Sequence, residues 1–316
     1  MVLSALILIF VVITVMFFLL EIAPGDPIQS LVGQVPVSDA FREQMNAAYG
    51  LDRPLVERYF TYLYNIVTGN LGFSYSNQQP VLDLILGRLG NTLWLTIPSL
   101  ILSSLGGILL GAIAARTRSK ALDGTISSLS IATFSIPNFW LALLLIIVFA
   151  VTLGWLPAQG MNSFTSSGIS VRHMILPVVS MAVAELAFKM RVMRSSMIEV
   201  LGQDYIDTAR SKGLTNNQIL WRHGMLNSML PMVSVIGYSA GFTIAGSVLI
   251  EKVFGWPGMG QLLFDSIQRS DNMVVMGILL IITIVVVIVN IITDVVYGLV
   301  DPRIRARMRR EAGGHK

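Results

Sequence analysis

The chain has 316 residues, a length that could form two soluble domains. Hydrophobic residues make up 54% of it and charged residues 13%, and its mean hydropathy is +0.71. Soluble domains carry about 25% charged residues, so this composition excludes a soluble protein and indicates an integral membrane protein. Cysteine is absent and the three histidines share no ligand spacing, so the sequence predicts neither disulfides nor a metal site.

Six apolar segments are long enough to cross a bilayer core of about 30 Å, which needs roughly 20 helical residues. Pro137 lies inside the third segment and predicts a kink or break there. Glu185 and Lys189 interrupt the fourth, which is therefore the least regular. The sequence predicts an all-α membrane protein with six transmembrane helices. These are residues 1–22 and about 93–115, 126–153, 174–193, 230–250 and 273–296.

The positive charges orient these helices, because cytoplasmic loops carry an excess of Lys and Arg. With the amino terminus inside, the inside loops hold 14 of the 22 Lys and Arg residues and the outside segments hold seven. Both termini are therefore predicted to be cytoplasmic. Residues 23–90 form an extracytoplasmic cap, residues 91–300 the membrane core and residues 301–316 a basic cytoplasmic tail. We interpret the tail as a topology and lipid-surface feature and expect no nucleic-acid partner.

Shorter signals describe the segments around the membrane helices. Residues 40–49 and 55–67 of the cap have helical patterns, and residues 261–268 read as a short amphipathic helix after a Gly/Pro-rich turn. Gly107-x-x-x-Gly111 and Gly237-x-x-x-Gly241 have the small-residue spacing that allows helices to approach closely in lipid. We interpret both pairs as packing positions.

The inside stretch 199–224, between the fourth and fifth predicted membrane helices, is too polar to cross the membrane. Residues 203–212 contain neither Pro nor Gly and predict a helix, with Gly213 well placed to cap its C-terminus. The acidic residues lie near its start and the basic residues near its end, which matches the helix dipole. These are Asp204, Asp207, Arg210 and Lys212.

One face of this predicted helix carries Ile206, Ala209 and Gly213 at spacings of three and four. The face is nearly bare of side chains, so a groove of another protein could approach its backbone closely. A helix lying on the membrane surface has the same pattern. The spacing alone leaves both interpretations open.

Residues 207–213, Asp-Thr-Ala-Arg-Ser-Lys-Gly, followed by Pro231, resemble the cytoplasmic coupling loop of binding-protein-dependent ABC importer permeases. The resemblance is closest to the dipeptide/oligopeptide/nickel branch, in which the loop docks into a cleft on the ATP-hydrolysing subunit. Three positions match the Glu-Ala-Ala…Gly core of that family, with Asp for its Glu and Thr for its first Ala. The resemblance implies ATPase-coupling roles for Asp204, Asp207, Thr208, Ala209, Arg210 and Gly213.

Other motifs of the same branch occur in register along almost the whole chain. They lie at residues 23–27, 69–74, 135–140, 251–260 and 301–305. The amino terminus departs from the pattern, since no basic residue precedes the first membrane helix. The resemblance implies the type I ABC importer permease fold, with an extracytoplasmic cap after the first helix.

The resemblance also implies an ATP-driven importer in a prokaryotic cytoplasmic (inner) membrane. Its partners would be a second homologous permease, two ABC ATPase subunits, an extracytoplasmic solute-binding protein and the lipid bilayer. The nearest approach to a phosphate-binding loop, Gly241 to Gly246, continues with Ser247 rather than Lys. We therefore expect no catalytic residue and no cofactor in this chain, with ATP and Mg²⁺ on the partner ATPase subunits.

Two groups of residues are candidates for contact with the solute and its binding protein. Glu185 and Lys189 have the favourable Glu-first spacing of four for an ion pair, and they either satisfy each other or contact a cation or a peptide terminus. A proline break in a polar stretch suits a cavity, and the outside Gly/Pro turn suits a docking surface. The remaining path candidates are Ser135, Asn138 and Trp140, and the docking candidates are Phe254, Trp256, Pro257 and Gly258.

The substrate stays open at this point. Peptides are the default of the branch, and nickel or other metal complexes and glutathione are alternatives. A secondary transporter, coupled through Glu185 or Asp294, is a less favoured reading because it would not need a helix at 203–212. An intramembrane hydrolase is the least favoured alternative, since no His lies well inside a membrane helix and no carboxylate pair recurs.

Overall fold

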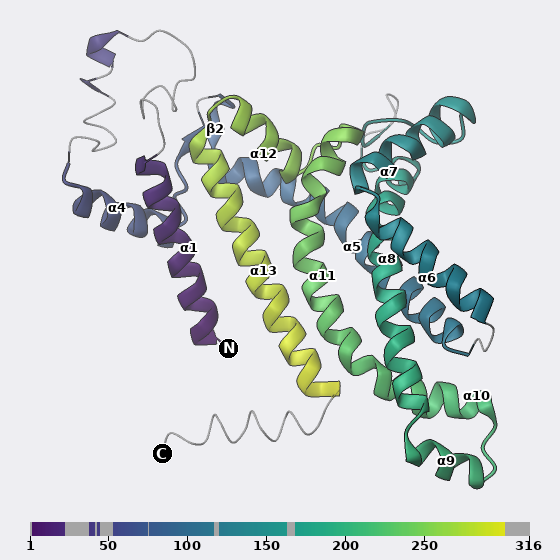
Figure 1. The fold of residues 1–316 in the computed structure, drawn as a ribbon. Helices are drawn as coiled ribbons and strands as arrows, with labels where there is room; N and C mark the ends of the chain where they lie inside the picture. Colours follow the sequence, from purple (N-terminus) through teal and green to yellow (C-terminus); the bar gives the residue numbers. More distant parts are fainter. Residues whose placement is uncertain are drawn as a thin grey trace, which may run out of the picture. The chain divides into compact units, whose positions relative to one another are not determined.

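The computed structural model describes residues 2–22, 38–41, 43–44, 53–74, 76–116, 120–162 and 168–300. The predicted motifs at 23–27 and 301–305, the basic tail and most of the predicted helix at 40–49 lie outside this part. The described chain is almost entirely helical (Figure 1). It forms two compact units, residues 1–93 with 256–287 and residues 94–255 with 288–316, and each is described by itself.

The first unit is built from apolar helices and one short hairpin. The antiparallel strands β1 and β2 pair Phe73 with Pro80 and Ser74 with Gln79. The bounds are α1 Val2–Ile22, α4 Leu55–Val67, β1 Phe73–Ser74, β2 Gln79–Pro80, the start of α5 Val81–Ala114, α12 Met259–Gln268 and most of α13 Asn272–Val300. The helices predicted at 55–67 and 261–268 are therefore confirmed.

The second unit holds the rest of α5 and the end of α13 together with the helices between them. Two of its elements are π-helical turns, η1 and η2. The bounds are α6 Lys120–Ser135, α7 Asn138–Leu145, η1 Ile146–Thr152, α8 Val171–Leu201, α9 Asp204–Ser211, α10 Asn216–Gln218, η2 Ile219–Gly224 and α11 Met225–Phe254.

Four described helical stretches are long and apolar enough to cross a membrane, and two shorter apolar helices accompany them. The first and third predicted membrane helices correspond to the shorter ones, so the total of six stays a prediction. The long stretches are Val81–Ala115, Val171–Leu201, Asn216–Phe254 and Asn272–Gly298, and the short ones are Leu3–Leu19 and Asn138–Thr152.

The break predicted at Pro137 is confirmed. Helix α6 ends at Ser135 and α7 begins at Asn138, with Pro137 in an extended conformation between them. Proline offers no backbone N–H, and it disfavours helical conformation in the residue before it. The third predicted segment is therefore two helices joined at a corner.

The first unit is held together around the start of α13. Asp271 accepts a hydrogen bond from the Ser74 hydroxyl at 2.6 Å, which ties the hairpin to the turn before α13. Gly72, with a φ of +89°, lets the hairpin backbone pass against Met273. Helices α5, α12 and α13 also share one hydrophobic core. It consists of Val81, Leu84, Ile85, Met259, Leu262, Val274 and Ile278.

In the second unit α8 packs against α6, α7 and α11. Helix α5 approaches α8 so closely that a Cβ on Gly107 would lie 2.6 Å from the Lys189 Cβ, and a Cβ on Gly111 would lie 2.6 Å from the Met190 carbonyl oxygen. A Cβ on Gly237 of α11 would lie closer still to the side chain of Thr293 of α13. The packing roles predicted for these three glycines are confirmed.

Candidate functional site

The helix predicted at 203–212 is present as α9, from Asp204 to Ser211 (Figure 1). Asp204 and Asp207 lie in its first turn and Arg210 in its last, as the helix dipole favours. The Arg210 guanidinium contacts the Asp207 carboxylate at 2.9 Å. Both side chains are half-exposed or more, so this pair contributes little to stability.

Gly213 ends α9 in the left-handed conformation, with a φ of +83°. Its N–H donates to the Arg210 carbonyl at 2.9 Å, and the Leu214 N–H donates to the Ala209 carbonyl at 3.3 Å. These are the two hydrogen bonds of a Schellman motif, and Leu214 packs against the cluster that contains Ala209. The C-terminal cap predicted at Gly213 is therefore confirmed, and α9 ends in a defined turn.

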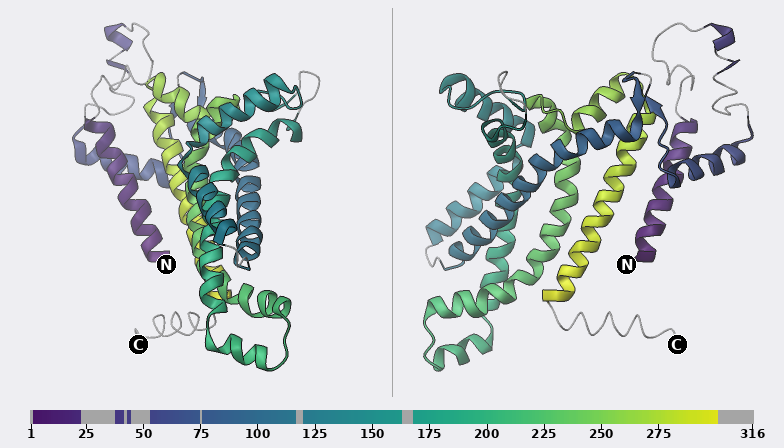
Figure 2. Two further views of the ribbon diagram at one scale, coloured as in Figure 1. Left: turned by 45° about the vertical axis from the view of Figure 1, so that its right-hand side comes forward. Right: turned by 180° about the vertical axis from the view of Figure 1, so that it is seen from behind.

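The next helix starts immediately after this turn. Thr215 and Gln218 form a capping box, in which the Gln218 N–H donates to the Thr215 hydroxyl at 3.3 Å and the Thr215 N–H donates to the Gln218 side chain at 2.9 Å. From Asn216 the chain is helical for 39 residues to Phe254, through α10, η2 and α11. On the other side only Gly202 and Gln203 separate α9 from α8. Short turns therefore join α9 to two long helices, as both views of Figure 2 show.

The inner face of α9 corrects one sequence-based expectation. Ile206 is fully buried and Ala209 is 7% exposed, and both pack in one cluster with Ile219, Leu201 and Leu214. Ile206 and Ala209 therefore pack against the chain itself rather than being open to a partner's groove, while Gly213, the third residue of this face, is exposed. Ala209 therefore holds α9 in place rather than offering a contact surface.

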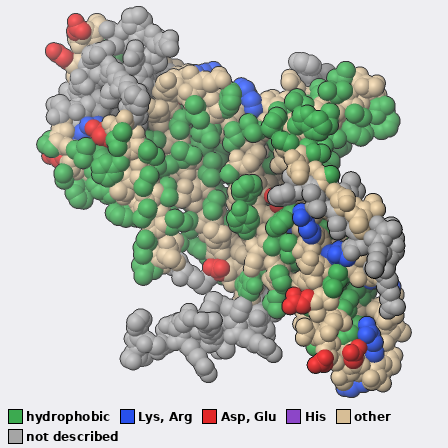
Figure 3. Space-filling model, in the orientation of Figure 1, with side chains coloured by type: hydrophobic (Ala, Val, Ile, Leu, Met, Phe, Trp, Pro, Cys, Tyr) green, Lys and Arg blue, Asp and Glu red, His purple; other side chains and the backbone are tan. Residues whose placement is uncertain are grey.

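The outer face of α9 is polar and exposed. Acidic and basic side chains gather there, at the lower right of Figure 3. Tyr205 leans back onto the start of α11, where the Asn227 amide donates to its hydroxyl at 2.9 Å. The sequence offered no signal for this contact, because the two residues lie on different elements. The exposed members of the predicted coupling set are Asp204, Asp207, Thr208, Arg210 and Gly213.

The ion pair predicted between Glu185 and Lys189 is present, with 3.4 Å between the Lys189 Nζ and the Glu185 Oε2. The sequence missed two further members of this group. The Lys189 Nζ donates to the Ser103 hydroxyl at 2.8 Å, and the Ser239 hydroxyl donates to the Glu185 Oε2 at 2.8 Å. One polar network therefore joins α5, α8 and α11.

The other predicted path residues lie around the break between α6 and α7. Ser135 and Trp140 are exposed and Asn138 is half-buried. Helix α7 packs against α8, the helix that carries the ion pair, and against α11. Their lining of a path stays a prediction.

The predicted docking turn has a different construction from the expected one. Trp256 is fully buried, and its indole N–H donates to the Asn91 carbonyl at 2.8 Å, while the Asn91 amide donates to the Pro257 carbonyl at 2.8 Å. Phe254 and Gly258 are also buried. None of these three residues is exposed, and their contact with a binding protein stays a prediction. Pro257 alone of the four is partly exposed.

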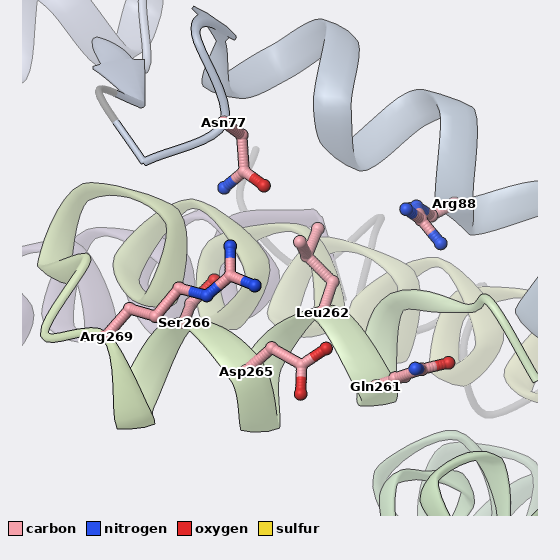
Figure 4. Close-up of a pocket in the computed structure, with 7 residues that line it drawn as sticks. All are labelled: Asn77, Arg88, Gln261, Leu262, Asp265, Ser266 and Arg269. Carbon is pink, nitrogen blue, oxygen red and sulfur yellow. The ribbon is translucent and has the colours of Figure 1, made fainter. Parts of the chain in front are cut away.

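A small polar pocket in the first unit was not predicted (Figure 4). Asn77 of the hairpin loop and Arg88 of α5 face side chains of α12 across it. Its polar lining with two arginines suits a charged or polar group rather than an apolar one. The lining residues are Asn77, Arg88, Gln261, Leu262, Asp265, Ser266 and Arg269.

Substitution of Gly213 tests the turn after α9. A Cβ at this position meets no atom within 4 Å, so only backbone strain opposes a larger residue. Valine in the left-handed conformation costs about 1–2 kcal/mol, whereas asparagine tolerates it. We expect Gly213→Val to speed amide hydrogen exchange at Gly213 and Leu214 by about fivefold or more, and Gly213→Asn to leave it nearly unchanged. Equal exchange in the two variants would show that the turn is not held in this conformation.

Comparison with known proteins agrees with this arrangement. The family described as binding-protein-dependent transport system inner membrane component matches residues 107–306, and its N-terminal companion matches residues 1–96. The glutathione transport system permease protein GsiC of Escherichia coli K12 is 37% identical over 94% of both chains. The oligopeptide transport system permease protein AppB of Bacillus subtilis is 40% identical over 91% of this chain and 92% of its own.

Among solved structures, a chain of the inward-facing MetNI methionine ABC transporter matches with a TM-score of 0.59 at 19% identity. The match covers 70% of this chain and 97% of that one, and it shows the type I importer permease fold. The resemblance noted from the coupling-loop motif is thus confirmed over nearly the full length. The chain therefore belongs to the family of binding-protein-dependent transport system inner membrane components, as a permease of an ABC importer in the peptide and glutathione branch.

Proposed function

We propose that this permease moves peptides or similar small solutes from an extracytoplasmic binding protein into the cytoplasm, driven by ATP hydrolysis on partner subunits. The complete importer would contain a second homologous permease and two ABC ATPase subunits, which hold the ATP and Mg²⁺. This chain would hold no cofactor and do no covalent chemistry. It would lie in a prokaryotic inner membrane with both termini in the cytoplasm.

The observation that carries this proposal is the attachment of α9. A force applied to its exposed face would pass through the buried contact of Ile206 and Ala209 with Ile219 into the helical stretch that continues as α11. The short turn at Gly202–Gln203 would pass it into α8 as well. Closure of the ATPase pair would thereby rock two long helices and expose a central site to alternate sides of the membrane.

The roles of the coupling residues divide by burial. Asp204, Asp207, Thr208 and Arg210 would contact the ATPase cleft from the exposed face. Ala209 would keep α9 seated, and Gly213 would fix the turn that follows it. Ser135, Asn138 and Trp140 would line the solute path near the α6–α7 corner.

The substrate class rests on the relatives. One is named for glutathione transport and another for oligopeptide transport, and both are peptides. Peptides are therefore the proposed class, with glutathione included in it. Nickel and other metal complexes are the alternative within the branch.

The test is reconstitution of the permease in liposomes with a second permease, two ATPase subunits and the binding protein. We expect ATP-dependent uptake of a labelled dipeptide, oligopeptide or glutathione, and stimulation of ATP hydrolysis by the loaded binding protein. Asp207→Lys reverses a charge that is 75% exposed, and it should reduce this stimulation at least tenfold without affecting membrane insertion. Asn216→Lys, at an exposed position on the next helix, is the matched control and should stay near wild type.

Three results would contradict the proposal or its substrate class. Uptake by this chain alone, driven by an ion gradient without the other subunits, would identify a secondary transporter instead. Normal coupling in the Asp207→Lys variant would remove the assigned role of the exposed α9 face. Uptake of a nickel complex, with no uptake of any peptide tested, would show that metal complexes are the substrate class.

A further inference from the structure

In the polar network of the second unit the cation is buried and the anion is partly exposed. The Lys189 side chain is completely buried, between the Glu185 carboxylate and the Ser103 hydroxyl. The Glu185 side chain keeps 22% of its surface exposed. The pair is neutral overall, but only its anion can be reached from outside. A molecule approaching this point of α8 therefore meets a negative edge.

The contacts of Glu185 are also one-sided. Lys189 and Ser239 both bind Oε2, at 3.4 and 2.8 Å. No hydrogen-bond donor among the described residues contacts Oε1. An ionised carboxylate has about four acceptor positions over its two oxygens, so Oε1 has capacity for a further donor.

The position of Glu185 in the helix limits what this open oxygen can face. Helix α8 is one of the four helical stretches able to cross a membrane, and Glu185 is near its middle. Ionisable groups within membrane helices face the bundle interior or a water-filled cavity rather than lipid. The exposed edge of Glu185 therefore faces a cavity or another protein.

Two aromatic rings lie on the neighbouring helix α11, one residue before Ser239 and three residues after it. Tyr238 and Phe242 of α11 stack with 5.9 Å between ring centroids and an interplanar angle of 22°. They are 69% and 60% exposed. At 3.6 residues per turn both lie to the same side of Ser239, whose hydroxyl holds Glu185. Aromatic faces attract cations, and this effect strengthens where water is scarce.

We propose that Glu185 Oε1 and the Tyr238–Phe242 stack form a binding point for a cationic amine of the transported solute, such as the amino terminus of a peptide. The inference rests on the proposed function, in which this permease lines the solute path. The ammonium would donate to Oε1 and lie against the aromatic faces. Lys189 would keep Oε2 paired whether or not the amine is present, so binding would be weak enough for the solute to leave.

The test uses the absence of cysteine from the chain. Tyr238→Cys and Phe242→Cys are made singly in the full chain and assembled with its partner subunits in membrane vesicles. The cysteines are then labelled with a cationic and an anionic methanethiosulfonate reagent, with rates normalised to a free thiol. We expect the cationic reagent to be at least fivefold favoured, and Glu185→Gln to reduce this preference to less than twofold.

Two variants guard against trivial explanations. Glu185→Gln leaves Lys189 buried without its counter-ion and can destabilise the fold, so Glu185→Gln/Lys189→Met removes both charges and must lose the preference equally. Leu249→Cys is also exposed on α11, about 10 Å further along, and its reagent preference should not depend on Glu185. A preference that persists without Glu185, or an equal change at Leu249→Cys, overturns the proposal.

Protection experiments show whether the bound cation is a peptide amine or a metal ion. Alanylalanine should slow labelling at Tyr238→Cys, whereas N-acetyl-alanylalanine and nickel chloride should not. Any other pattern of protection overturns the amine assignment. Cysteines that react with neither reagent in any nucleotide state would show that another protein or lipid covers this face, which also overturns it.

Uptake measured on the unmodified transporter in the same vesicles separates this inference from the proposed function. ATP-dependent uptake with a reagent preference that ignores Glu185 would reject the amine site alone. A Glu185-dependent preference without ATP-dependent uptake would reject the proposed function and leave an amine-binding point without a transport role.

Discussion

Replacing Ile206 with aspartate is expected to abolish ATP-driven uptake while leaving the long helices inserted in the membrane. Ile206 is fully buried beneath α9, where it packs with Ile219, Leu201 and Leu214. Burying an unpaired carboxylate in this apolar cluster costs several kcal/mol of folding free energy. Helix α9 would therefore detach from the cluster rather than bury the charge. The ATPase subunits could then move α9 without moving α11.

The measurement is ATP hydrolysis and solute uptake in liposomes, together with copurification of the ATPase subunits. We expect uptake to fall below a tenth of the wild-type rate and hydrolysis to lose its response to the loaded binding protein. Ile206→Val nearly conserves the buried volume and should cost about 1 kcal/mol, with coupling retained. Gln203→Asp adds the same charge at the exposed N-cap of α9, where a carboxylate is favourable, and should be tolerated. If Ile206→Asp couples like the wild type, the buried contact between α9 and the flanking helices does not transmit the movement of the ATPase subunits.

The sequence was sufficient to predict α9 and its C-terminal turn because their causes are local. The charge order, the absence of Pro and Gly within the helix and the glycine after it all act within one or two turns. The same pattern could not show which protein covers the apolar face. Ile219 and Leu201, which do so, belong to the flanking helices and not to the periodicity of α9. For this reason Ala209→Trp would disturb the chain's own packing before it could obstruct a partner's cleft.

The polar network around Glu185 was also predictable only in part. Glu185 and Lys189 are four residues apart on one helix, so their ion pair follows from helical geometry. Ser103 is 86 residues from Lys189 and Ser239 is 54 residues from Glu185, and nothing in the sequence links them. Only the packing of three helices brings them together.

The burial of Trp256 in the predicted docking turn was missed for a similar reason. Glycine and proline correctly indicated a turn at 251–260, and turns usually lie at the surface. Trp256 is nevertheless buried, because Asn91, 165 residues earlier in the chain, offers its carbonyl to the indole N–H.

The bounds of the long helices differ from those of the predicted apolar segments. Hydropathy identifies only the part of a helix that lies in the lipid, and a helix can continue beyond that part. Helix α5 begins at Val81, so its first turns lie within the predicted cap.

A leucine at Gly111 is expected to disrupt the packing of α5 on α8 and to destabilise the whole second unit. The Cβ alone would lie 2.6 Å from the Met190 carbonyl oxygen, 2.7 Å from the Met193 Cβ and 3.1 Å from the Arg194 nitrogen. Two of these atoms belong to the backbone of α8 and cannot move aside as a flexible side chain would. Overpacking of this kind costs about 1–3 kcal/mol and occasionally more, and we expect the upper end of this range.

Thermal unfolding of the purified permease, followed by circular dichroism or by loss of monodisperse protein, gives the comparison. Gly111→Leu should lower the midpoint by about 5 °C or more, and Gly111→Ala should lower it by a smaller amount. Gly87→Leu is the matched control, since Gly87 lies on the same helix and a Cβ there meets no atom within 4 Å. Leucine is the better helix former by close to 1 kcal/mol, so this variant should unfold at or slightly above the wild-type temperature. If Gly111→Leu and Gly87→Leu unfold together, α5 and α8 do not touch at Gly111, and the small-residue spacing there has no role in packing.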